Sequence, residues 1–122
     1  MKGSRRTEIL RLLGLARRAG LVVFGTEAVR GAIRQGDARL VLMAEDASAS
    51  QLDKVRRTLV NRPIPQARLG DRAMLGAAVG RGPVSVVAVT VASLAERLRA
   101  KLGADTVGDA NQAEDWRQNA GH

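Results

Sequence analysis

The chain has 122 residues and a mass of 13.0 kDa, and 45% of its residues are apolar, so it has room for one small core and not for several domains. It has no cysteine and its only histidine is His122, which excludes disulfide frameworks, thiolate metal sites and histidine-based catalysis. Twenty lysines and arginines against twelve acidic residues give a net charge of +8, which favours a polyanionic partner, nucleic acid ahead of membrane.

This charge is unevenly distributed. Residues 1–102 hold 19 cations and 8 anions, a net +11, whereas residues 103–122 hold one cation and four anions, a net −3. The acidic segment has a single large apolar side chain, Trp116, which is too little to offset the entropy of ordering it. We therefore predict a folded basic domain over 1–102 and an acidic, disordered tail over 103–122. Arginines interrupt the apolar run near the N-terminus, so we expect no export signal, no membrane contact and a cytoplasmic location.

The first predicted elements are a helix, a strand and a second helix. Apolar residues recur at three- and four-residue steps over 7–19, which predicts a helix closed by Gly20. The apolar run 21–24 predicts a strand that places Phe24 in the core. A second helix is then expected, capped by Thr26 and ended by Gly36.

The middle of the chain repeats this alternation. Residues 40–44 are continuously apolar, which is typical of a strand covered on both faces. Capping-box spacing at Ser48–Gln51 predicts a third helix, and Pro63 forbids its continuation. Residues 64–69 contain Pro65, which predicts an edge strand or a poorly formed one.

Three further elements complete the predicted domain. Asp71 is expected to cap a short fourth helix, and residues 84–91 form the strongest predicted strand. A second capping-box spacing, at Ser93–Glu96, predicts a last helix that ends at Leu102. Five helices alternating with four apolar strands predict an α/β fold, a three-layer α/β/α sandwich on a four-stranded mixed sheet.

The sequence contains few candidate catalytic residues. Glu45 and Asp46 are adjacent at a predicted strand end, where their side chains would point to opposite faces, so we expect Asp46 to bond to the backbone instead. The glycine-rich stretch 76–82 follows a helix and precedes a strand, the reverse of the order in a dinucleotide-binding fingerprint. We predict no enzyme activity, no cofactor and no metal site.

Arginine-rich features at predicted loops and helix ends point to RNA. The start of the second helix offers backbone N–H groups, a hydroxyl and guanidinium groups to a phosphate or a base edge, and a turn near the same end of the sheet adds another arginine. The candidate RNA-binding residues are Gly25, Thr26, Glu27, Arg30, Arg34, Arg81, Gly82 and Pro83. Backbone contacts from Arg17, Arg18 and Arg39 are possible additions. An ordinary capped helix with solvated arginines would explain the same residues.

Aromatic content narrows the kind of RNA. Phe24 and Trp116 are the only aromatic residues, so the chain lacks the stacking platform with which single strands are bound. Recognition of folded RNA by its shape is the remaining mode.

Several segments resemble the bacterial YlxQ branch of the kink-turn-binding ribosomal protein superfamily. The resemblance extends over residues 5–102, and the segments that carry it are 12–20 (LLGLARRAG), 25–27 (GTE), 32–34 (AIR) and 40–48 (LVLMAEDAS). It implies an α/β/α sandwich, a non-catalytic RNA-binding role at ribosomal or other structured RNA, and RNA contacts at residues 25–31 and at the loop 79–83.

The RNA-contacting segment departs from the family pattern. Typical kink-turn binders have Asn-Glu after the Gly-Thr and a lysine further along the helix, where this chain has Glu27, Ala28 and Gly31. A carboxylate lacks the NH₂ donor of asparagine and repels phosphate. The main hypothesis is a monomeric, non-enzymatic binder of structured RNA, with ribosomal RNA as the first candidate. The alternative is a protein-interaction module on the same fold that has lost kink-turn recognition, with a partner in translation or transcription.

Overall fold

The computed structural model describes residues 3–103, so the predicted acidic tail lies outside the described residues apart from Gly103. The elements alternate in the predicted order. They are α1 (Gly3–Arg18), β1 (Val22–Phe24), α2 (Thr26–Arg34), β2 (Leu40–Met43), α3 (Ala49–Leu59), β3 (Gln66–Arg68), α4 (Arg72–Ala78), β4 (Val86–Val89) and α5 (Ala92–Leu102). None of the helices in residues 3–103 has the length and apolar character needed to cross a bilayer.

The four strands form one mixed sheet in the order β1-β4-β2-β3. β4 runs antiparallel to β1 and β2, whereas β2 and β3 are parallel. The edge position expected for the strand after Pro65 is confirmed, because β3 pairs only with β2. A proline beside an edge strand leaves no central ladder bond unmade.

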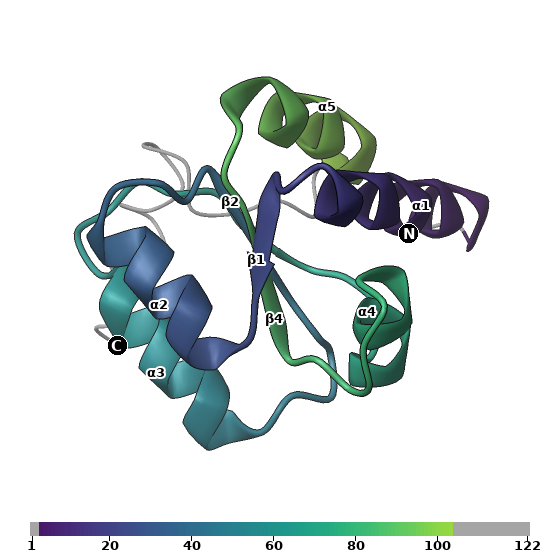
Figure 1. The fold of residues 1–122 in the computed structure, drawn as a ribbon. Coiled ribbons are helices and arrows are strands. Elements are labelled where there is room, and N and C mark those ends of the chain that lie inside the picture. Colours follow the sequence, from purple (N-terminus) through teal and green to yellow (C-terminus); the bar gives the residue numbers. More distant parts are fainter. Residues whose placement is uncertain (1–2, 104–122) are drawn as a thin grey trace.

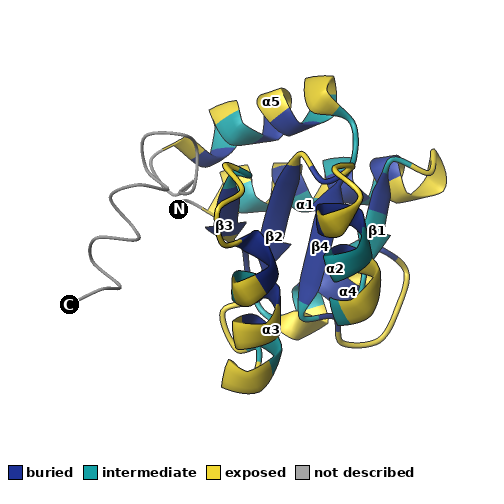
Figure 2. Ribbon diagram, turned by 90° about the vertical axis from the view of Figure 1, so that its left-hand side faces the viewer, coloured by how far each residue is buried: buried dark blue, intermediate teal, exposed yellow. Residues whose placement is uncertain are grey.

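Helices cover both faces of this sheet (Figure 1). Alternate strand side chains point to opposite faces, and the core divides accordingly into two clusters. The sheet residues under α2 and α3 are Val41, Met43, Val86 and Ala88, and those under α1, α4 and α5 are Leu40, Leu42, Val87 and Val89. All eight are buried, and the exposed residues gather on the outer sides of the helices (Figure 2). The predicted three-layer α/β/α sandwich is confirmed.

Two of the predicted caps are correct. The Ser48 hydroxyl accepts a hydrogen bond from the backbone N–H of Gln51 at 3.2 Å. The Asp71 carboxylate accepts one from the N–H of Met74 at 2.8 Å, at the start of α4. Each satisfies a donor that the first helical turn leaves unpaired.

The other two predicted caps are wrong. Gly25, with φ of 94°, holds the cap position of α2, so Thr26 is already inside the helix and its hydroxyl caps nothing. The Gly25 N–H bonds to the Val86 carbonyl oxygen in β4 at 3.0 Å, and this contact makes the chain turn directly from strand to helix through a backbone conformation that glycine tolerates. Likewise α5 begins at Ala92, immediately after β4, which leaves Ser93 inside the helix without a capping role.

Strand directions place the loops at two opposite ends of the sheet. At the end that we call the Gly25 end, β1, β2 and β3 finish and β4 begins, so the N-termini of α2 and α3 and the loop 79–85 lie there. At the other end, the Arg39 end, β2 and β3 begin and β4 finishes, beside the C-terminus of α2 and the start of α5.

Candidate nucleic-acid interface

Two arginines contact one aromatic ring at the Gly25 end. Phe24 is the last residue of β1, and its ring centroid lies 5.5 Å from the guanidinium carbon of Arg17 and 5.1 Å from that of Arg81. These distances are typical of cation–π contacts, which hold guanidinium groups in defined positions. Arg17 comes from the last turn of α1 and Arg81 from the loop between α4 and β4. Two neighbouring elements and a loop about 60 positions later thus build one cationic surface.

Phe24 lies less deep than the sequence predicts. Its ring packs against the core below α1 but is only partly buried. Phe24 is the last residue of β1, which lies at the edge of the sheet and pairs there with β4. The pattern of an apolar run closed by glycine could not distinguish this position from a central one.

The loop that carries Arg81 is held close against α4. The Arg81 N–H donates to the carbonyl oxygen of Gly76 at 2.7 Å, and the Val84 N–H donates to that of Arg72 at 3.0 Å. A Cβ atom on Gly76 would lie 1.9 Å from the carbonyl oxygen of Gly82, so only glycine permits this approach. The backbone around Arg81 therefore has a fixed position relative to α4.

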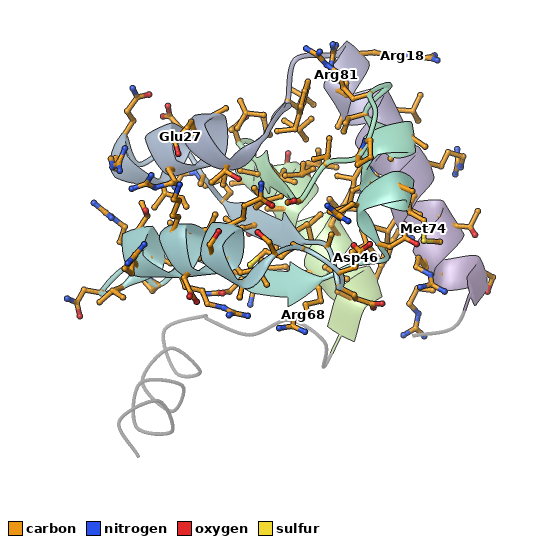
Figure 3. All side chains as sticks on the ribbon, turned by 90° about the horizontal axis from the view of Figure 1, so that it is seen from below. Arg18, Glu27, Asp46, Arg68, Met74 and Arg81 are labelled. Atoms are coloured by element: carbon orange, nitrogen blue, oxygen red, sulfur yellow. The ribbon has the colours of Figure 1, made fainter. Side chains whose placement is uncertain are left out.

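A shallow hollow adjoins this loop between α1 and α4. It has a volume of about 260 Å³, and Arg17 and Arg18 line it opposite residues 77–80. Figure 3 shows Arg18 and Arg81 beside α1, and Glu27 on α2 across from them. We call the group of Arg17, Arg18, Phe24 and Arg81 the Arg81 cluster.

The start of α2 offers backbone donors and one acidic side chain. No described side chain caps the helix, so the N–H groups of its first turn are available to an anion. Glu27 is exposed and its carboxylate lies 3.0 Å from Nη1 of Arg30. The Nε of Arg30 donates to the Thr58 hydroxyl of α3 at 3.1 Å. Arg30 is therefore committed to α3 and to Glu27.

The structure brings most of the candidate residues to one end of the fold. Gly25, Thr26 and Glu27 lie at the Gly25 end together with the exposed loop 81–83. Arg34 does not join them, because it ends α2 and lies at the Arg39 end. Phe24 was missed as a site residue. Its signal in the sequence is the lone aromatic directly before the Gly-Thr pair.

Asp46, which follows β2, has a structural role. The Asp46 carboxylate accepts a hydrogen bond from the Arg72 N–H at 2.8 Å and lies 3.6 Å from Nε of the same residue. Asp46 thus binds the first turn of α4, as expected. Residues 3–103 contain no group of three or more acidic, histidine or cysteine side chains placed to hold a metal ion.

Comparisons with a family model and with a curated protein point to the same family. Residues 7–99 match the model of the ribosomal protein L7Ae/L30e/S12e/Gadd45 family. The chain is similar to the RNA-binding protein YlxQ of Bacillus subtilis (strain 168), with 41% identity over 87 residues, which cover 71% of this chain and 87% of that protein.

Two solved structures share the architecture. A protein of unknown function from Bacillus halodurans C superposes with a TM-score of 0.72 at 34% identity, over 77% of this chain and 95% of that one. The Giardia lamblia 15.5kD RNA binding protein superposes with a TM-score of 0.65 over 83% of this chain and 92% of that one. At 18% identity, the second likeness concerns the fold alone.

Proposed function

Because the chain belongs to the ribosomal protein L7Ae/L30e/S12e/Gadd45 family, as a YlxQ-type member, we propose that it is a non-enzymatic protein that binds structured RNA at the Gly25 end. The observation that carries this proposal is the Arg81 cluster, which stands beside the uncapped N-terminus of α2. Guanidinium groups bind phosphates through paired hydrogen bonds, and helix N–H groups add fixed donors.

The cluster suits the backbone of a folded RNA better than single bases. The guanidinium carbons of Arg17 and Arg81 lie 5.5 Å and 5.1 Å from the centroid of the Phe24 ring, so the ring helps to position both cations. Arginines held in this way present planar donors at a fixed spacing, which favours an RNA whose phosphates have a matching spacing. Ribosomal RNA and kink-turn-like RNA are the first candidates.

Glu27 limits how α2 reads bases. Its carboxylate accepts from Arg30 and cannot donate a hydrogen bond to a base edge. We therefore propose that phosphate contacts from the Arg81 cluster supply most of the affinity.

We further propose that the protein acts as a monomer in the cytoplasm. In residues 3–103 the exposed large apolar side chains are Leu15 and Val60, which belong to α1 and to the end of α3. Two isolated side chains do not make the contiguous apolar patch of a stable dimer. A reducing compartment agrees with a chain that has no cysteine.

RNA binding measured against salt concentration tests this function. The ligands are a kink-turn RNA, a ribosomal RNA fragment and a straight duplex. Each is titrated with wild type and with the variant Arg17→Ala/Arg81→Ala. The control variant is Arg11→Ala/Arg97→Ala, which removes the same charge from the outer sides of α1 and α5. We expect the first variant to flatten the slope of log K against log salt by about 1–2, because each lost phosphate contact removes somewhat less than one released ion.

Equal losses in both variants would place the RNA elsewhere, and no binding at low salt would refute the function. In that case, a protein partner captured after nuclease treatment would support the alternative of a protein-interaction module.

A further inference from the structure

A second basic surface lies at the Arg39 end. It is a hollow of about 620 Å³ lined by four arginines from four parts of the chain, and we call it the Arg39 groove. Its arginines are Arg34 of α2, Arg39 before β2, Arg62 before β3 and Arg99 of α5. Glu96 is the one acidic residue among its described lining residues, so the groove carries a net charge of +3.

Apolar side chains form much of the remaining wall. They come from the end of α2, the start of β2, the turn before β3 and one face of α5, and they are Ile33, Ala38, Pro63, Ile64, Pro65, Ala92 and Ala95. A groove with cationic edges and apolar walls fits an acidic peptide that carries an apolar side chain.

The charge of the groove is incompletely balanced within the described part of the chain. Arg34 and Arg39 are exposed and pair with no acidic side chain of residues 3–103. Arg62 donates to the carbonyl oxygen of Thr58. Like charges gathered around one hollow repel each other, so an anionic occupant would lower the energy of this end.

We propose that the acidic segment 104–122 of the same chain binds in the Arg39 groove. The segment contains Asp105, Asp109, Glu114 and Asp115 against one arginine, a net charge of −3 that balances the groove. Its carboxylates match guanidinium groups in paired hydrogen bonds. Trp116 follows the Glu114–Asp115 pair and supplies the large apolar side chain that the walls accommodate.

The segment has the length to reach the groove. It starts directly after Gly103, and Arg99 lies one helical turn before that point. The eleven residues of α5 are about 16 Å long, so the far end of the groove at Ala92 is no farther than that along the helix. Twelve residues separate Gly103 from Trp116 and extend to about 40 Å. Covalent attachment also gives the segment an effective concentration of about a millimolar.

This contact would make the two ends of the molecule differ in charge. The family match ends at residue 99, so the acidic segment is an addition to the shared domain. When it neutralises the Arg39 groove, the Arg81 cluster at the opposite end remains exposed. The segment thus directs polyanions to one end of the fold.

Trp116 fluorescence tests the contact in the full chain. The protein has one tryptophan and no tyrosine, so its emission reports on the acidic segment alone. Quenching by acrylamide, which is neutral, is measured for wild type, for Arg34→Glu/Arg39→Glu and for Arg17→Glu/Arg81→Glu as the control at the other end. We expect the groove variant to raise the quenching constant about twofold and to lower the anisotropy, because a released tether moves freely. Wild type in 1 M salt, where the Debye length is about 3 Å, should behave in the same way.

A charge swap separates the contact from damage to the fold. Adding Glu114→Arg/Asp115→Arg to the groove variant should restore the protection of Trp116, which a misfolded protein would not do. Quenching that is equal in wild type and the groove variant would overturn the proposal, as would equal release by the control pair. Unchanged quenching together with weaker RNA binding by the groove variant would assign the groove to RNA and also overturn it.

Discussion

Substitution of Gly76 by alanine should destabilise the fold, although helix propensity alone predicts that it stabilises α4. Gly76 is in α4, where helix propensity alone favours alanine over glycine by about 1 kcal/mol. The structure predicts the opposite outcome, because the new Cβ atom would lie 1.9 Å from the Gly82 carbonyl oxygen and 2.7 Å from its carbonyl carbon. Both atoms belong to the backbone, so no side-chain rotation relieves the clash.

The size of the effect follows from these distances. Ordinary contact begins at 3.4 Å, so the Gly82 backbone must withdraw by about 1.5 Å. Overpacking of this kind costs about 3 kcal/mol at the upper end of its usual range. After the gain in helix propensity, about 2 kcal/mol of net destabilisation remains. For a domain of this size, this loss lowers Tm by about 10 °C.

Thermal and urea unfolding of matched variants provide the assay. Gly31→Ala in α2 is the control, because a Cβ there meets nothing within 4 Å, and we expect it to raise stability by up to about 1 kcal/mol. Gly76→Ala should also weaken RNA binding, since the displaced backbone carries Arg81. If Gly76→Ala raised Tm as Gly31→Ala does, the close approach of α4 to the loop would be refuted.

Three further substitutions probe single contacts. Glu27→Gln should tighten binding to structured RNA about fivefold in filter-binding assays at fixed salt, because it removes about 1 kcal/mol of repulsion and keeps an acceptor for Arg30; weaker binding would contradict the placement of phosphate near α2. The Nζ atom of Lys101 lies 2.7 Å from Oε1 of Glu8, and its hydrogen bond and charge lower the pKa of the Glu8 carboxyl. The pair therefore stabilises the fold at pH values above the pKa of Glu8 in the unfolded chain. This stabilisation is lost as the pH falls through the lower pKa of Glu8 in the folded chain. Lys101→Met should therefore lower Tm at neutral pH and differ progressively less from wild type below pH 4.5, whereas a difference that grows on acidification would disprove the pairing. Asp46→Ala should cost about 1 kcal/mol in urea unfolding by removing the acceptor of the Arg72 N–H, and a change in RNA affinity at equal folded fraction would argue against a purely structural role.

The layered fold could be predicted because its strands are apolar on both faces. Residues 40–44 and 84–91 have no polar alternation, and this pattern requires helices on either side. Helix starts were predictable where a side chain makes the cap, as Ser48 and Asp71 do. They were not predictable where a backbone contact decides the start. At Gly25 the bond to β4 sets the turn, and no local pattern reports a partner 61 positions away.

The candidate site was harder to predict than the fold. Residues next to one another in sequence, such as Gly25 and Glu27, were found together because they begin one helix. The contact of Arg17 and Arg81 with Phe24 depends on the register of β1 against β4 and on the packing of α4, which sequence periodicity does not specify. Arg34 follows Arg30 by one turn, yet that single turn moves it toward the Arg39 end.

The strand order also determines when the candidate interface can form. β1 pairs with β4 alone, and Phe24 meets Val87, 63 positions later in the chain. Because β4 is the last strand in the chain, this pairing cannot form before residues 86–89 have been synthesised. A nascent chain that has not yet released β4 from the ribosome holds Arg17 and Phe24 without the ladder that aligns them with Arg81. The Arg81 cluster therefore takes its full shape only when synthesis of the domain is nearly finished.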